Sequence, residues 1–124
     1  MSKKSIRHDG LCPIERVLDV FGGKWKPAIV YSLMTHGTLR FNELRKLSPG
    51  ISQRMLTQQL RELERDGVVS REQFLEIPPR VEYTLTELGL SFGPLGEAIE
   101  AWGDAHMAAV EKERKKYDRR KEQP

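Results

Sequence analysis

The chain has 124 residues, of which 38% are hydrophobic and 31% charged. This size and balance are typical of one folded domain, and they argue against a disordered chain or an enzyme with separate cofactor and substrate lobes. Its single cysteine cannot close an intrachain disulfide, and no apolar run reaches the length of a membrane span. We expect a soluble cytoplasmic protein with one domain over 1–124, whose core is about 12–103 and whose ends, 1–10 and 111–124, are mobile or frayed.

Charge is distributed unevenly along the chain, although the net charge is only +3. Residues 1–61 carry eleven basic and four acidic side chains, whereas residues 62–104 carry three basic and ten acidic ones. Residues 105–124 are basic again, with seven basic side chains and four acidic ones. This segregation indicates a positive surface that attracts a polyanion, and an ordinary solvated surface is the alternative.

Apolar spacing and turn residues divide the first part of the chain into short elements. Helices are predicted over about 13–21 and 27–35, each with a proline in its first turn and glycine after its end. Residues 38–40 favour a short strand, and 41–47 a third helix. The Ser-Pro-Gly sequence at 48–50 predicts a tight turn.

The strongest helical pattern follows this turn. Ser52 is a good N-cap for a helix that runs to about Asp66, and leucines at positions 56, 60 and 63 form its buried stripe. The opposite face is polar and carries arginine, glutamine and threonine. Its acidic residues lie at the C-terminal end, away from the turn.

A β-hairpin and a long helical region complete the chain. Strands are predicted over about 68–76 and 80–85, with two prolines in the connecting loop. Thr86 caps a final helical region that is broken or kinked by Gly89, Gly93, Pro94 and Gly96. Beyond about Val110 the residues predict either a solvated helix end or a frayed tail.

The order of these elements is that of a winged helix-turn-helix, a mainly α fold with a small β-hairpin (α+β). Arginine, glutamine and threonine on an exposed helix can hydrogen-bond base edges in the major groove of DNA, although an ordinary solvated helix face is also polar. The predicted base-reading residues are Ser52, Gln53, Arg54, Thr57, Gln58 and Arg61.

Further basic and polar residues are predicted to contact the DNA backbone. Arg40, Asn42, Arg45 and Lys46 lie on or just before the preceding helix, where they could bind phosphates. Arg80, next to the hairpin loop, could enter a minor groove or clamp the backbone. The alternative for Arg80 is a cation that merely keeps an edge strand soluble.

Five motifs, taken in order, resemble the HxlR-type winged helix-turn-helix transcriptional regulators: 12–16 (CPIER), 22–27 (GGKWKP), 39–44 (LRFNEL), 49–63 and 78–89. The resemblance covers roughly 12–103. It implies a homodimeric bacterial or archaeal DNA-binding regulator, with a recognition helix over 52–66 and dimerisation helices at the N- and C-terminal ends.

Apolar residues on the first and last helices also indicate a dimer, independently of the family resemblance. A small motif cannot bury all of them alone, although the last helix could instead close its own core. A dimer would place two recognition helices about 34 Å apart on a near-palindromic operator in double-stranded DNA. The predicted interface residues are Ile14, Val17, Leu18, Phe21, Leu95, Ile99 and Trp102.

Cys12 is a candidate redox or electrophile sensor. It lies at or near a helix N-terminus, where the helix dipole and Arg16 favour the thiolate form. Some members of the family that the chain resembles use an N-terminal cysteine to sense quinones, aldehydes or oxidants. A buried, inert cysteine is the alternative.

Enzymatic, metal and cofactor chemistry find no support in the sequence. Gly23-Lys24 lacks the remainder of a Walker motif, and His8, His36 and His106 are too irregularly spaced for a zinc site with Cys12. We therefore predict no enzyme, no metal and no cofactor. The competing function is a winged-helix protein-interaction module that does not bind DNA. A small-molecule effector is compatible with the DNA-binding regulator.

Overall fold

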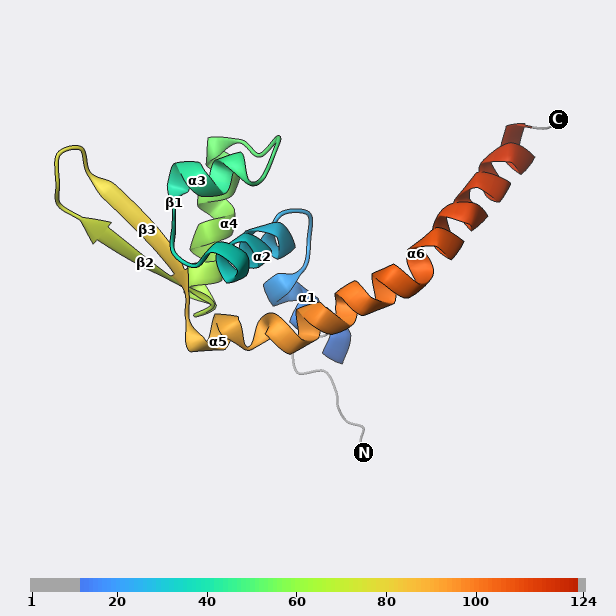
Figure 1. Ribbon diagram of the computed structural model, residues 1–124, viewed down its shortest axis with the longest axis horizontal. Coiled ribbons are helices and arrows are strands. Elements are labelled where there is room, and N and C mark those ends of the chain that lie inside the picture. The colour runs from blue at the N-terminus through green and yellow to red at the C-terminus, as the bar shows by residue number, and fades with distance from the viewer. Residues whose placement is uncertain (1–11, 123–124) are drawn as a thin grey trace. The chain divides into compact units, whose positions relative to one another are not determined.

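A computed structural model describes residues 12–122, so the prediction for residues 1–10 lies outside the described residues. The chain divides into two compact units, one ending at Leu90 and one beginning at Ser91, and each is treated by itself. The elements of Figure 1 are α1 (Pro13–Phe21), α2 (Lys26–His36), β1 (Leu39–Arg40), α3 (Phe41–Lys46), α4 (Gln53–Arg65), β2 (Val69–Phe74), β3 (Arg80–Leu85), α5 (Glu87–Leu90) and α6 (Phe92–Glu122). The predicted mainly helical fold with a small antiparallel sheet is confirmed.

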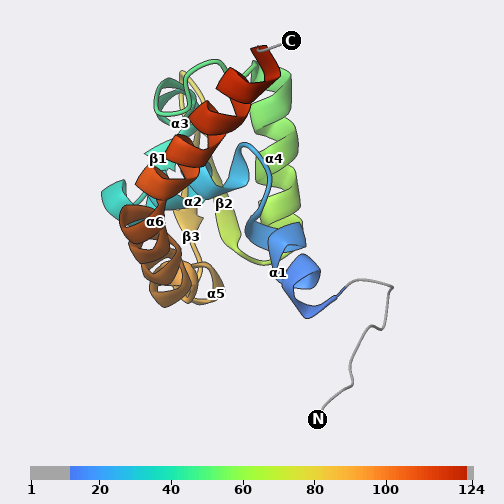
Figure 2. The same cartoon turned by 90° about the vertical axis from the view of Figure 1, so that its right-hand side faces the viewer.

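The core of the first unit lies where α2, α3 and α4 meet the sheet. Its fully buried side chains include Ile29 and Leu33 of α2, Leu44 of α3, and all three leucines predicted for the stripe on α4. Burial of large aliphatic side chains is the main favourable contribution to folding, at roughly 1.5–3 kcal/mol each. These contacts fix the orientation of α4, which Figure 2 shows as a straight helix.

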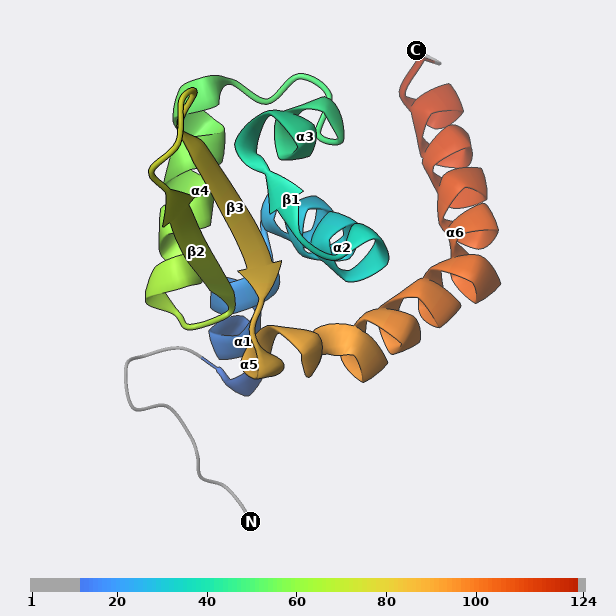
Figure 3. The same ribbon diagram turned by 60° about the vertical axis from the view of Figure 1, so that its left-hand side comes forward.

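The sheet has three strands in the order β1-β3-β2, all antiparallel (Figure 3). Arg71 of β2 is in register with Tyr83 of β3, and Leu39 of β1 is in register with the same tyrosine on its other side. The sequence predicted the hairpin and the short strand. It did not predict that the short strand would pair with β3.

The turn between α3 and α4 determines where α4 begins. Gly50 has a φ of +89°, a left-handed conformation that glycine adopts without steric cost. Ile51 donates its backbone N–H to the Ser48 carbonyl at 3.1 Å, and the Ser52 hydroxyl accepts from the Met55 N–H at 3.0 Å. The predicted turn and N-cap are therefore both confirmed.

The second unit is the single helix α6. The final helical region is interrupted at Ser91 and not at the four residues predicted to break it: Gly89 lies within α5, and Gly93, Pro94 and Gly96 belong to the beginning of α6. Proline is tolerated there because N–H groups in the first turn have no partner within the helix. Of the two alternatives for the residues after Val110, the structure shows the solvated helix end, since 111–122 are helical and exposed. Within residues 12–122, no helix combines the length and apolar character needed to cross a membrane.

Candidate nucleic-acid interface

The polar face of α4 is open to solvent within the first unit. Gln53, Arg54, Gln58 and Arg61 are exposed, whereas Thr57 is half-buried. The three leucines on the other side of the helix are at most 1% exposed. A rigidly held helix therefore presents the predicted base-reading side chains outward from this unit.

Two hydrogen bonds orient side chains on this face. The Thr57 hydroxyl donates to the Gln53 carbonyl at 2.9 Å, and the Gln58 amide donates to the Glu62 carboxylate at 3.3 Å. Glu62 in turn forms an ion pair with Lys26 of α2. Hydrogen bonds from Lys26 and then from Gln58 lower the pKa of Glu62, because both favour its charged form.

Helix α3 and the residue before it supply exposed cations next to α4. Arg40, Asn42, Arg45 and Lys46 are all exposed. The Glu43 carboxylate accepts from the Arg40 backbone N–H at 2.7 Å, which closes the first turn of α3. None of the three cations forms an ion pair in the part of the chain that is described. They are available to an external anion.

Arg80, by contrast, is engaged within the wing. Its guanidinium lies 3.3 Å from Glu76 and 3.2 Å from Glu82, and it stacks over the Phe74 ring with 4.0 Å to the ring centroid. A DNA contact by Arg80 stays a prediction. It would require exchange of two carboxylate partners for phosphate.

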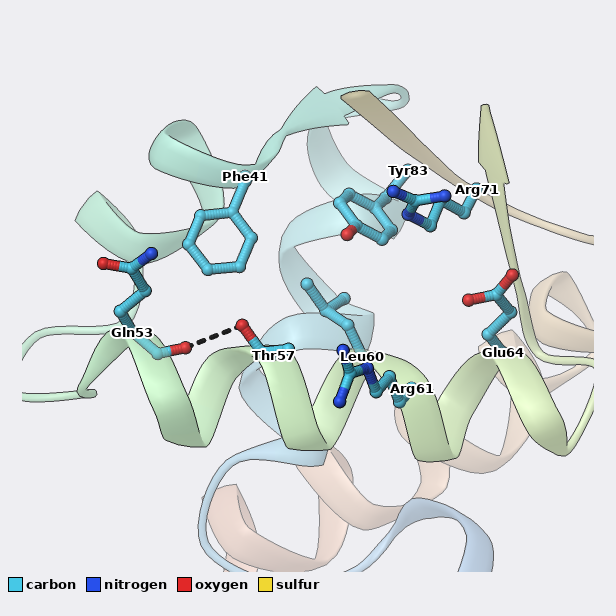
Figure 4. Close-up of a pocket in the computed structure, with 8 residues that line it drawn as sticks. All are labelled: Phe41, Gln53, Thr57, Leu60, Arg61, Glu64, Arg71 and Tyr83. Carbon is cyan, nitrogen blue, oxygen red and sulfur yellow. Dashed lines mark hydrogen bonds between the residues drawn. The ribbon is translucent and has the colours of Figure 1, made fainter. Parts of the chain in front are cut away.

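A polar cleft lies between α4 and the wing, with Phe41 of α3 on one side (Figure 4). Arg71 and Tyr83 line it from the sheet, and Arg61 lines it from α4. No role was predicted for Arg71 or Tyr83 from the sequence. Their shared face could have been inferred only from the register that pairs them, which sequence pattern did not supply.

Cys12 is the N-cap residue of α1, as its position before Pro13 predicted. Its Sγ accepts from the Glu15 N–H at 3.4 Å, and the Glu15 carboxylate accepts from the Cys12 N–H at 3.1 Å. The hydrogen bond from the Cys12 backbone N–H, and after it an interaction with the Cys12 side chain, lower the pKa of the Glu15 carboxyl group. The sulfur is partly exposed, and it has a carboxylate as well as the helix N-terminus beside it.

The predicted dimer residues are mostly exposed in the single chain. Ile14 is 70% exposed on α1, and Trp102 is 56% exposed on α6. Val17, Leu18, Leu95 and Ile99 are exposed as well, and Phe21 is half-buried. Within the described residues, no three His, Cys, Asp or Glu side chains are grouped as metal ligands would be.

Known proteins are similar to this chain in both sequence and fold. The model of the HxlR-like helix-turn-helix family matches residues 20–111. The uncharacterized helix-turn-helix-type transcriptional regulator YdeP of Bacillus subtilis is 52% identical over 101 residues, which are 82% of this chain and 78% of YdeP.

Two solved structures show the same similarity in three dimensions. The redox regulator HypR in its reduced form superposes with a TM-score of 0.75 and 49% identity, over 81% of this chain and 98% of that one. The reduced form of the transcriptional regulator YodB from B. subtilis superposes with a TM-score of 0.69 and 37% identity, over 77% and 94% of the two chains.

The helix-turn-helix of α3 and α4, flanked by the β2–β3 hairpin, defines a winged-helix protein of the transcriptional-regulator class. The chain belongs to the HxlR-like helix-turn-helix family.

Proposed function

We propose that this regulator binds operator DNA through α4, with the N-terminal part of the helix in the major groove. The observation that carries the proposal is the division of α4 into a fully buried leucine stripe and an exposed face of Gln53, Arg54, Gln58 and Arg61. Recognition helices contact base edges with their N-terminal residues, and Gln53 and Arg54 lie in the first turn of α4. The unpaired cations of α3 would bind phosphates beside the groove.

We propose that the binding unit is a homodimer. The exposed apolar residues of α1 and α6 support this, because isolated proteins rarely leave so many large apolar side chains in water. Trp102 is the type of residue that anchors interfaces. Sedimentation of Trp102→Glu should show loss of the dimer. Ile77→Glu, a control at the fully exposed wing loop, should leave it intact.

Selection of bound fragments from genomic DNA tests DNA recognition directly. We expect a near-palindromic sequence whose half-sites are about one helical turn apart, bound with an affinity that falls steeply with salt. Affinity that does not depend on sequence or salt would contradict the proposal and favour the protein-interaction alternative.

We further propose that oxidation of the Cys12 thiol changes DNA binding. The partly exposed N-cap position of Cys12 supports this. Two proteins of similar structure support it as well: HypR is described as a redox regulator, and YodB has been solved in a reduced form. Titration of operator binding with a mild oxidant tests it. Unchanged affinity after full oxidation of Cys12 would contradict it.

A further inference from the structure

The cleft between α4 and the wing has a volume of about 510 Å³. Its walls come from four elements, with Phe41 on α3, Leu60 and Arg61 on α4, Arg71 on β2 and Tyr83 on β3 (Figure 4). All belong to the first unit. The cleft therefore opens beside the same α4 face that is proposed to enter the major groove.

Tyr83 supplies a polar group that the fold does not use. The residue is only 7% exposed, and its hydroxyl is turned into the cleft near Leu60 (Figure 4). This hydroxyl has no hydrogen-bond partner in the described chain. Since it is not among the buried polar atoms without a partner, this hydroxyl opens to the solvent in the cleft and can hydrogen-bond an external group.

Two guanidinium groups flank this hydroxyl. Arg71 lies directly across the hairpin from Tyr83 and shares its face of the sheet, and Arg61 lines the cleft from α4. Neither arginine forms an ion pair in residues 12–122. Glu64 is the acidic residue among those lining the cleft, which leaves it with a net charge of +1.

A phosphodiester group fits this chemistry. It carries one negative charge, which the cleft would neutralise, and its oxygens accept hydrogen bonds from guanidinium and phenol groups. A phosphomonoester carries nearly two negative charges at neutral pH, and Glu64 would oppose the second. The charge count thus favours the backbone of a nucleic acid over a free phosphate ester.

The far end of the wing lacks these properties. Arg80 ends the hairpin ladder opposite Phe74, and its guanidinium is already paired with Glu76 of the loop and with Glu82. Glu72 and Glu82 follow Arg71 and Tyr83 in the register, so their side chains lie on the other face of the sheet. An external phosphate would therefore compete with two carboxylates for Arg80 at the end of the hairpin, whereas Arg61 and Arg71 at the cleft have no carboxylate partner in the described residues.

We propose that Arg71 and Tyr83, together with Arg61, bind one backbone phosphate of the operator and so anchor the wing at the middle of its strands rather than at its loop. This inference rests on the proposed DNA binding by α4 and adds the contact that sets the spacing between helix and wing. A positioning contact of this kind affects all sequences alike.

Operator affinity, measured over a range of salt concentrations, tests the anchor. Arg71→Ala should weaken binding about tenfold on the operator and on unrelated duplexes, and should reduce the log–log salt slope by about 0.9. Tyr83→Phe keeps the ring and should weaken binding about fivefold with an unchanged slope. Arg119→Ala on α6, which removes the same charge elsewhere, should leave both affinity and slope close to wild type.

The outcomes separate this inference from the proposed function. Wild-type protein that binds no DNA would defeat both. Operator binding that survives Arg71→Ala and Tyr83→Phe unchanged would defeat the anchor alone. Thermal melting of each variant shows that it is folded. Binding of adenosine monophosphate that depends on Arg71, without any loss of operator affinity in Arg71→Ala, would assign the cleft to a free phosphate ester and overturn the backbone assignment.

Discussion

The ammonium group of Lys26 lies 2.6 Å from the carboxylate of Glu62, and it joins the start of α2 to the C-terminal part of α4. Lys26 is 8% exposed, whereas the Glu62 side chain remains 40% exposed. Glu62 also accepts a hydrogen bond from Gln58. A buried lysine is thus connected, through one carboxylate, to a predicted base-reading side chain.

Removal of either partner of this pair should have unequal effects on stability. Glu62→Ala leaves the Lys26 ammonium buried without a partner, and we expect a loss of about 1–2 kcal/mol in the free energy of unfolding. Lys26→Met keeps the apolar stem and leaves only a half-exposed carboxylate unpaired, so its loss should stay below about 1 kcal/mol. Urea denaturation of both variants measures the difference. Equal losses in unfolding free energy would mean that burial of the Lys26 ammonium group does not make the loss of Glu62 the more costly change.

Stability should also respond to acid through Glu62. Its pKa is lowered in the folded chain by hydrogen bonds from Lys26 and Gln58. A carboxylate with a lowered folded pKa stabilises the protein above its unfolded pKa, and that contribution disappears as the pH falls through the folded pKa. The melting temperature of Glu62→Gln should therefore lie below wild type near neutral pH, and the two should converge below the ordinary pKa of glutamate. A constant difference across the acid range would contradict this.

Elements that depend on local sequence were predictable, and contacts that depend on tertiary pairing were not. Leucine spacing, the Ser52 cap and the turn at Gly50 each follow from residues within one or two turns. The ion pair of Lys26 and the shared face of Arg71 and Tyr83 depend on elements far apart in the chain. Periodicity within one segment does not reveal them.

The same distinction applies to the candidate site. The exposed α4 face followed from the leucine stripe, because the opposite side of an amphipathic helix faces solvent. Arg80 was singled out as a cation beside the hairpin loop, but its engagement with Glu76 and Glu82 depends on how the loop folds back. Charge alone did not show which cations are already paired.

The N-cap geometry of Cys12 allows its redox role to be separated from its structural role. Serine is among the best N-caps, so Cys12→Ser should preserve α1 while removing oxidant sensitivity. Cys12→Ala removes the side-chain acceptor as well, and should reduce stability by about 0.5–2 kcal/mol. Operator binding with and without diamide, followed for wild type and Cys12→Ser, makes the comparison. Equal responses of the two proteins would remove Cys12 from the mechanism.

Gly89 lies where α5 passes close to the beginning of the hairpin. A Cβ there would collide with the Val68 carbonyl oxygen and lie 2.9 Å from the Leu85 side chain. Gly89→Ala should therefore cost about 1–3 kcal/mol of unfolding free energy through backbone displacement. Gly103→Ala is the matched control in α6, because its new Cβ meets only the Met107 side chain at 3.8 Å. It should raise stability by up to about 1 kcal/mol, since alanine is the better helix former.

Single alanine substitutions of exposed cations on α3 and α4 should distinguish contacts with bases from contacts with phosphates. Arg54 lies in the first turn of α4, and Arg54→Ala should relax the preference at one base pair by about 1–3 kcal/mol. Lys46 ends α3, and Lys46→Ala should weaken all duplexes alike and reduce the salt slope by about 1. Binding to a set of single-base operator variants, at two salt concentrations, distinguishes the effects. If Arg54→Ala instead weakens every variant equally, Arg54 contacts the backbone and α4 lies in the groove at a different angle from the one proposed.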